Sequence, residues 1–379
     1  MKICIKGWSK INHSYSIICR NQLIEFTKLP VDLKFSETPY KNDKWSHSNN
    51  FHGFSEKDDK SLLSIDFPKD NELFDVIYRL DFPYNFGKNN SKKLFVYGTS
   101  EYQHINNMYI NEVSDNFKKR EDLKIITSSK WSKNGFIKSG FDENQVEVIS
   151  LGVNSNIFYP ISLEKKNKIK KKLNLSEEDF IISNVGSMTT NKGIDHLIVA
   201  FAILKKKYKN LKLILKDQSN LYDITGYDVF SEIKNGKIGH LINENIKKDI
   251  IFISQNMTLS ILNDLYNISD CYVSPYRAEG FNLCPLEAAA TGTPIIVTKG
   301  GATDDYFKEE FGLQIDSKLM ISSNKSYVEP NLESLLDNIS SVIQNPKKYG
   351  NEKSIKFIRE NFSWKKIVEK TYNVFNKSL

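Results

Sequence analysis

Short apolar runs alternate with polar turns and amphipathic stretches along most of this 379-residue chain. In the first half, this pattern predicts buried strands at residues 2–6, 75–80, 93–97, 124–128 and 145–149, with an extended segment at 32–35. In the second half it predicts strands at residues 180–184, 211–215, 249–253, 271–273 and 295–297. Helical patterns separate most of these strands. The alternation favours an α/β fold built on two doubly wound parallel sheets.

The helical patterns show which faces are buried and where the chain divides. The stretch IDHLIVAFAILKKKY carries an apolar face made of Ile194, Leu197, Ile198, Phe201 and Leu204. After the turn-rich segment SLGVNSNIFYP, the composition changes to a lysine-rich helix. We therefore expect a first domain at residues 1–159, a second at 160–361, and a final amphipathic helix at 362–379.

Composition narrows the class of protein. Lys and Arg number 53 against 46 Asp and Glu, a net charge of +7. Lysine runs on helices are most simply solvated faces, although a membrane-surface or anionic-substrate preference stays open. Nucleic-acid binding is not expected, because no recognition module accompanies the charge. The chain has no apolar run near the roughly 18 residues of a membrane span and no signal-peptide pattern, so a cytoplasmic location is expected.

Cysteine and histidine usage gives no indication of a metal site. The four cysteines and six histidines lack the spacings of zinc ligands or of a disulfide framework. Cys4 and Cys271 fall in apolar strand patterns and are predicted to be buried thiols. We expect neither a bound metal nor a cofactor.

Candidate chemistry is concentrated between residues 274 and 305, SPYRAEGFNLCPLEAAATGTPIIVTKGGATDD. Glu279 falls on a loop beside Gly280, which lets the backbone approach a ligand. Glu287 opens a helical run at residues 287–290 and is expected in a helix's first turn. A surface residue matched to the helix dipole is the alternative interpretation. Helix-start amides favour anions and carboxylates accept from hydroxyls, so this stretch could hold a phosphate and a polyhydroxyl.

Polar residues also follow the predicted strands of the first half. They are Asn12, His13, Ser14 and Tyr15 after the first strand, and Thr99, Ser100 and Glu101 after residues 93–97. Ligands of open parallel sheets gather beyond the carboxyl ends of strands, which makes these residues candidates for facing a cleft. For His13 and Ser14, helix capping is an equal alternative.

The segments EGF (279–281), LEA (286–288) and GTPI (292–295), with Glu279 and Glu287 separated by seven residues, resemble the Glu-x7-Glu motif of retaining glycosyltransferase family 4. VGSMTTNKG (185–193) resembles that family's glycine loop and Lys-Gly segment. The resemblance implies a GT-B fold, in which two Rossmann-like domains face a cleft. The first domain would bind the acceptor and the second a nucleotide sugar.

The resemblance also implies roles for single residues. Lys192 and the amides of Gly186 and Ser187 would hold the diphosphate, although Ser187 stands where the family commonly has Arg. Glu287 would accept hydrogen bonds from the ribose hydroxyls. Glu279, together with the amides of Phe281 and Asn282, would hold the hydroxyls of the donor sugar. The implied donor set is Gly186, Ser187, Lys192, Gln255, Asn256, Met257, Glu279, Gly280, Phe281, Asn282, Leu283 and Glu287. Asn12, His13, Ser14, Tyr15 and Glu101 would face the acceptor, and Glu279, Lys192 and Glu101 would carry catalysis.

The implied activity is a metal-independent, hexosyltransferase-type transfer with retention. A GDP- or UDP-linked sugar would be moved to a hydroxyl of a glycan or glycoconjugate acceptor. Two alternatives stay open: a nucleotide-sugar epimerase of the same fold, and a catalytically silent protein that binds sugar nucleotides or glycans. Peripheral contact with a membrane also stays open.

Overall fold

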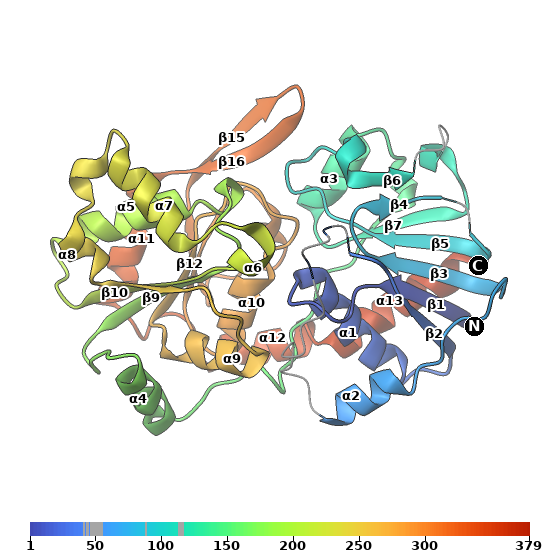
Figure 1. The fold of residues 1–379 in the computed structure, drawn as a ribbon, viewed down its shortest axis with the longest axis horizontal. Helices are drawn as coiled ribbons and strands as arrows, with labels where there is room; N and C mark the ends of the chain where they lie inside the picture. The colour runs from blue at the N-terminus through green and yellow to red at the C-terminus, as the bar shows by residue number, and fades with distance from the viewer. Residues whose placement is uncertain (41, 43–44, 46–55, 88, 113–116) are drawn as a thin grey trace. The chain divides into compact units, whose positions relative to one another are not determined.

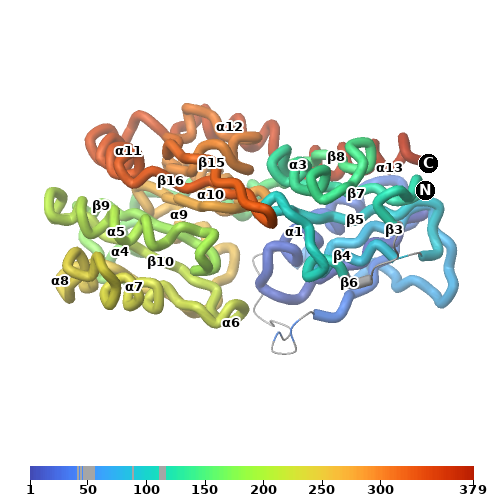
Figure 2. The backbone as a smooth tube through the Cα atoms, turned by 90° about the horizontal axis from the view of Figure 1, so that it is seen from above, coloured from blue at the N-terminus to red at the C-terminus, as the bar shows by residue number. Residues whose placement is uncertain are grey.

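The computed structural model describes residues 1–40, 42, 45, 56–87, 89–112 and 117–379. They form two compact units (Figures 1 and 2). The first comprises Met1–Asn154, Ser323–Lys325 and Asn361–Leu379, and the second comprises Ser155–Ser322 and Ser326–Glu360. Along the chain the first division falls between Asn154 and Ser155, whereas we expected a boundary near Tyr159.

The first unit is built on a six-stranded sheet with the order β2-β1-β3-β5-β7-β8, in which every pairing is parallel. The order reverses between β1 and β3, so the loops that follow these two strands meet at a switch point. The strands are β1 (Lys2–Gly7), β2 (Asp32–Glu37), β3 (Phe74–Leu80), β5 (Ser91–Tyr97), β7 (Leu123–Thr127) and β8 (Val146–Val148). A small parallel pair, β4 (Tyr84–Asn85) with β6 (Ile110–Glu112), stands apart from this sheet.

Helices from both ends of the sequence cover the first sheet. They are α1 (Ser14–Phe26), α2 (Glu56–Leu63), α3 (Lys130–Lys138) and α13 (Trp364–Ser378), with 3₁₀ turns η1 (Asn107–Tyr109), η2 (Phe117–Lys119) and η3 (Glu143–Gln145). In Figure 1 the red α13 runs beside α1. The Phe375 ring of α13 lies 5.9 Å from the Phe26 ring and 4.5 Å from the Phe95 ring, so the last helix completes this core.

The second unit repeats the architecture with the order β11-β10-β9-β12-β13-β14, again parallel throughout. Here the order reverses between β9 and β12, as in dinucleotide-binding sheets. The strands are β9 (Phe180–Val185), β10 (Leu211–Lys216), β11 (Ile250–Ile253), β12 (Cys271–Ser274), β13 (Ile295–Thr298) and β14 (Gly312–Ile315). The prediction of two parallel sheets is confirmed.

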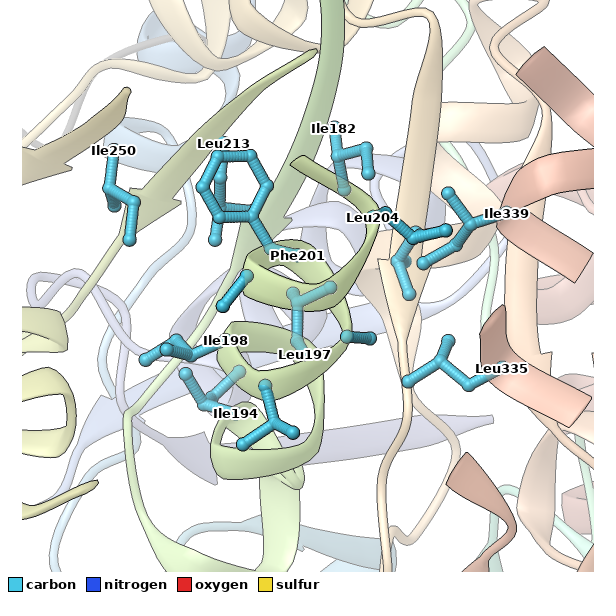
Figure 3. Close-up of a cluster of buried hydrophobic side chains, with 14 of the residues drawn as sticks. Ile182, Ile194, Leu197, Ile198, Phe201, Leu204, Leu213, Ile250, Leu335 and Ile339 are labelled. Carbon is cyan, nitrogen blue, oxygen red and sulfur yellow. The ribbon is translucent and has the colours of Figure 1, made fainter. Parts of the chain in front are cut away.

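The second unit's core lies between its sheet and α5 (Ile194–Lys205). Figure 3 shows the predicted apolar face of α5 directed at strand residues Ile182 and Leu213 and at Leu335 and Ile339 of a neighbouring helix. The five residues of that face are all buried, which confirms the prediction. The other helical elements are α4 (Leu163–Lys172), α6 (Ser219–Tyr222), α7 (Gly226–Asn235), α8 (Glu244–Lys247), α9 (Leu259–Ile268), α10 (Leu283–Ala290), α11 (Leu332–Gln344), α12 (Glu352–Asn361), η4 (Thr190–Lys192), η5 (Gly239–Leu241) and η6 (Ala302–Asp305).

Several features lie outside the sequence predictions. They include β14, the β4–β6 pair and a two-stranded sheet of β15 (Ser317–Ser322) and β16 (Lys325–Pro330). The helix that holds Glu287 also begins at Leu283 rather than Glu287. Pro285, which precedes the helical run predicted at residues 287–290, lies in the first turn of α10, where a missing N–H costs nothing. Within the described part of the chain, no helix combines the length and apolar character needed to cross a membrane.

Candidate functional site

The loops that follow β9 and β12 bring most of the predicted donor residues together. These strands are neighbours at the point where the strand order of the second sheet reverses. Gly186, Ser187 and Lys192 come from the loop after β9, and residues 279–283 come from the loop and helix start after β12. Ligands of open parallel sheets bind at such points.

An ion pair joins the two loops. The Lys192 Nζ lies 2.6 Å from Oε1 of Glu279, and Glu279 is 7% exposed. A short, charge-assisted contact between partly buried groups fixes both side chains more firmly than a surface pair would. The pair therefore places one cation and one carboxylate, already oriented, at the strand ends.

Two glycines of the loop after β9 have opposite surroundings. Gly186 has φ +149°, and a Cβ added to it would meet no heavy atom within 4 Å. Gly193 has φ +66°, and a Cβ there would lie 1.9 Å from the Pro275 carbonyl oxygen. Gly193 lets α5 begin against the β12 loop, whereas Gly186 borders open space that a ligand could occupy.

Asn191 ties the same two loops together. Its carbonyl oxygen accepts from the backbone N–H groups of Arg277 at 2.7 Å and Ala278 at 3.2 Å. Its side-chain amide donates to the Ala278 carbonyl oxygen at 3.1 Å. The Lys192–Glu279 contact therefore rests on a backbone framework.

The start of α10 faces the site without a side-chain cap. Its N-cap residue, Asn282, has φ +68° and makes no capping hydrogen bond from its side chain. The side-chain amide of Asn282 instead donates to Ser274 Oγ at 2.9 Å. The backbone carbonyl oxygen of Asn282 accepts from the Tyr306 hydroxyl at 2.8 Å. A helix start with unpaired N–H groups and a positive dipole end favours an anion.

The position of Glu287 in the structure differs from both interpretations of the sequence. It lies in the second turn of α10, where it is 3% exposed, so a first-turn or surface position is wrong. Its Oε2 accepts from Tyr266 OH at 3.1 Å. Burial raises the pKa of Glu287 to about 8, an effect that the Tyr266 hydrogen bond only partly offsets. Its carboxyl group therefore holds a proton at neutral pH in this structure.

The three predicted base-pocket residues share the loop between β11 and α9. Gln255 and Asn256 are exposed there and Met257 is half-buried. β11 is the edge strand of the sheet, whereas the ion pair lies at the β9 and β12 ends. Their contribution to a site stays a prediction.

In the first unit, the predicted acceptor residues take different positions. His13 is the N-cap of α1, and its Nδ1 accepts from Tyr15 N at 3.1 Å, so the capping interpretation of His13 is confirmed. Ser14 begins the helix and is exposed, and Asn12 is half-buried. Tyr15 is buried among rings, 6.1 Å from the Trp8 ring and 5.3 Å from the Tyr97 ring.

Tyr84 connects Tyr15 to the loop that carries Glu101. The Tyr84 hydroxyl lies 3.1 Å from the Tyr15 hydroxyl, donates to the Thr99 carbonyl at 2.7 Å and is contacted by the Thr99 N–H at 2.8 Å. Burial raises the pKa of Tyr84, with the Glu101 charge adding to the rise. The structure thus gathers Tyr15 and Glu101 around one buried tyrosine, which the sequence did not single out.

Sequence reasoning also missed a charged network around Arg277. The guanidinium contacts Asp195 at 2.7 Å and Glu329 at 3.0 Å, and lies 2.8 Å from His196 Nδ1. These partners come from α5 and β16, far from Arg277 in sequence, so no local pattern marks them. In the described residues, His, Cys, Asp and Glu form no cluster of three or more suited to a metal.

Solved structures define the class of fold. HepE of Anabaena in complex with UDP-glucose matches with a TM-score of 0.70 and 14% identity, covering 100% of both chains. Sucrose-phosphate synthase of Thermosynechococcus elongatus matches with a TM-score of 0.68 and 16% identity, covering 100% of this chain and 98% of that one. The molecule has the GT-B fold, two parallel-sheet α/β units.

The sequence comparison gives the family. The model of "Glycosyl transferases group 1" matches residues 165–359, just over half of the chain, and the protein belongs to that family. The Staphylococcus aureus capsular polysaccharide biosynthesis glycosyltransferase CapM is 28% identical over 51% of this chain and 48% of its own. The mannosylfructose-phosphate synthase of Agrobacterium fabrum is 25% identical over 46% of this chain and 40% of its own. The chain thus spans about half the length of these relatives.

Proposed function

We propose that this protein transfers a hexose from a nucleoside diphosphate sugar to a hydroxyl group of a glycan or glycoconjugate, with retention at the anomeric carbon and without a divalent metal ion. The observation that carries the proposal is the Lys192–Glu279 pair, set between the open space at Gly186 and the uncapped start of α10. It supplies a cation, amides and a carboxylate at one strand edge.

The leaving group determines the chemistry that such a site must supply. When the bond between the anomeric carbon and the diphosphate breaks, negative charge grows on the phosphate oxygens. Donors fixed in advance lower the barrier to that step. The Lys192 ammonium, the Gly186 and Ser187 amides and the α10 start would be those donors, so no metal ion is needed.

The two glutamates divide the rest of the donor between them. Glu279 would accept hydrogen bonds from hydroxyls of the sugar, and the amides of Phe281 and Asn282 would donate to its oxygens. Glu287 would bind the ribose hydroxyls, and hydrogen bonds from these to its carboxyl group would favour the ionised form. Donor binding would then release the proton that Glu287 holds in the unliganded protein.

The first unit would select the acceptor. Asn12, Ser14, Tyr15 and Glu101 lie at or near strand ends of its sheet, and Glu101 is the carboxylate we assign to the anomeric centre. His13 would act through its cap on α1, by fixing the loop that carries Asn12. A glycan acceptor agrees with CapM, whose name places it in capsular polysaccharide biosynthesis.

The test is to incubate the purified protein with UDP- and GDP-hexoses, with and without acceptor oligosaccharides, and to follow free nucleoside diphosphate and product. UDP-glucose is the first donor to try, since HepE was solved with it. We expect nucleotide release that depends on acceptor, persists in EDTA, and gives an anomeric configuration in the product equal to that of the donor.

Other outcomes would contradict the proposal. Isomerised donor without nucleotide release indicates an epimerase. Tight donor binding with no turnover for any acceptor indicates a silent binding protein. Loss of transfer in EDTA, restored by Mg²⁺ or Mn²⁺, would refute metal independence alone.

A further inference from the structure

Lys216 is the last residue of β10, and it is buried against the sheet with only 4% of its surface exposed. Leu211, Leu213 and Leu215 of the same strand pack in the core beneath α5. Side chains alternate along a strand, so Lys212, Ile214 and Lys216 project from the opposite face.

The Lys216 ammonium has an unusual set of partners for a buried lysine. Its Nζ donates to the carbonyl oxygen of Asp217. Among the described residues, no carboxylate forms an ion pair with it. The Asp217 carboxylate instead accepts from Ser219 N at 3.1 Å, Gly226 N at 3.2 Å and Ser254 Oγ at 2.8 Å.

Lys212 provides a direct comparison on the same strand and the same face. Its Nζ lies 2.5 Å from Oδ1 of Asp249, so its charge is paired. Lys216 is more deeply buried and lacks such a pair. Burial lowers the pKa of Lys216, and Asp217 and Cys284 offset this only in part. A buried charge of this kind is costly unless an anion joins it.

Lys216 also lies where such an anion would bind. It pairs with Val185 of β9 in the sheet register, and its carbonyl accepts from Gly186 N at 3.1 Å. Gly186 is the residue bordered by open space. The Cys284 side chain, in the first turn of α10, lies within electrostatic range of both Lys216 and Lys192. Both lysines are therefore near the start of α10.

The charges at the site favour a second cation. Lys192 is already paired with Glu279, and Ser187 offers only a hydroxyl, which bonds to Thr189 Oγ1 at 2.9 Å. A diphosphate leaving group carries more negative charge than one paired lysine can balance. Lys216 adds a buried ammonium group on the neighbouring strand, and no carboxylate of the described residues forms an ion pair with it.

We propose that Lys216 is the second cation of the diphosphate site, and that its ammonium binds the phosphates of the nucleotide opposite Lys192. This assignment rests on the proposed function, because it needs a diphosphate ligand. Lys216 would be a binding residue that contributes to both ground-state affinity and departure of the leaving group.

The test measures affinity for UDP, GDP and the matching nucleosides by calorimetry at fixed ionic strength, in wild type, Lys216→Met and Lys212→Met. Loss of a charge-assisted contact should weaken nucleoside diphosphate binding about 10- to 100-fold in Lys216→Met, with nucleoside binding changed less than about threefold. Lys212→Met is the matched control, from the same strand face, and should bind both as wild type does.

Folding is checked first by circular dichroism. If Lys216→Met does not fold, Lys216→Gln replaces it in the same comparison, since Gln keeps a donor for the Asp217 carbonyl but no charge. Diphosphate affinity unchanged in a folded Lys216 variant would overturn the assignment and leave the proposed function intact. Equal losses for nucleoside and diphosphate would also overturn it, as a packing effect. Failure of wild type to bind any nucleoside diphosphate would refute the proposed function itself.

Discussion

The two sheets share the same parallel architecture, but different residues occupy the carboxyl ends of their strands. One edge holds open space and a charged pair, and the other holds packed aromatic rings. In the second unit, the loop after β9 leaves open space at Gly186, and its Lys192 lies 2.6 Å from Glu279 of the loop after β12. In the first unit, the loop after β5 is closed by rings: a Cβ on Gly98 would lie 2.9 Å from Phe136 Cζ and 3.1 Å from Tyr84 Cζ. The glycine at the strand end therefore borders open space in the second unit, whereas in the first unit it allows close packing of aromatic rings.

The difference teaches that a shared fold does not give the two strand edges a shared role. Charge and open backbone fit a phosphate, whereas a network of buried tyrosine hydroxyls mainly fixes the shape of a surface. We therefore expect substitutions at the Lys192–Glu279 edge of the second unit to act on nucleotide chemistry, and those among the packed rings around Gly98 and Tyr84 of the first unit to act on stability. Four experiments test this contrast.

The largest effect should come from Lys192→Met. Losing the cation that stabilises the leaving group should lower the rate of donor turnover by about 100- to 1,000-fold. Lys168→Met is the control, because Lys168 pairs with Glu164 on the exposed surface of α4. The measurement is nucleotide release at saturating donor. A folded variant with turnover near that of wild type would remove Lys192 from the mechanism.

The pH dependence of stability should reveal Glu287. Its pKa is about 8 when folded and near 4.5 when unfolded, so between these values the folded state holds a proton that the unfolded state has lost. Stability must therefore fall as pH rises through this window. From pH 5 to 7, wild type should lose about 2–3 kcal/mol more than Glu287→Gln.

Thermal unfolding of both proteins at several pH values measures this difference. The same group predicts that UDP or GDP binding at pH 7 releases up to about one proton, detected by calorimetry in buffers of different ionisation enthalpy. Parallel stability profiles for the two proteins would show that Glu287 is already ionised in the folded state.

A pair of glycine substitutions tests the contrast directly. Gly98→Ala forces a methyl group into rings and should destabilise the protein by about 2 kcal/mol. Gly186→Ala has free space but a φ of +149°, and should cost only about 1 kcal/mol while weakening nucleotide binding. Chemical denaturation and nucleotide titration separate the two effects. The contrast fails if Gly186→Ala is the more destabilising of the pair.

The smallest effect should come from Tyr84→Phe. It removes a buried hydroxyl that contacts both the N–H and the carbonyl of Thr99, and should cost about 1–2 kcal/mol of stability. Nucleotide affinity should not change. Tyr227→Phe is the control, since Tyr227 is exposed. A loss of nucleotide affinity in Tyr84→Phe would mean that the first unit contributes to the donor site.

The sequence predicted those parts of the molecule that follow from local periodicity. Every strand expected in the two sheets is present, and Cys4 and Cys271 are buried thiols as expected. The loops that bear Lys192 and Glu279 were also identified, because glycine and charge stand out against apolar strands. The contact between them was not, since it joins residues 87 positions apart.

What the sequence could not give depends on tertiary neighbours. The helical run was predicted to start at Glu287, after Pro285, although a proline in the first turn only replaces an unpaired N–H. Glu287 was therefore placed one turn too early, and its hydrogen bond to Tyr266 of another helix has no local sequence signal. Lys216 reads as one lysine among many until the register of β10 with β9 sets it beside Gly186.

The packing of α13 has a consequence for synthesis of the chain. Phe375 fills the first unit's core against Phe26 and Phe95, and the Val153 N–H donates to the Phe362 carbonyl at 2.6 Å. A ribosome delivers these residues only after the whole second unit. The first unit therefore emerges early yet must wait, with an unfilled gap in its core, while the second unit can finish first. The first unit therefore leaves the ribosome first but completes its core last.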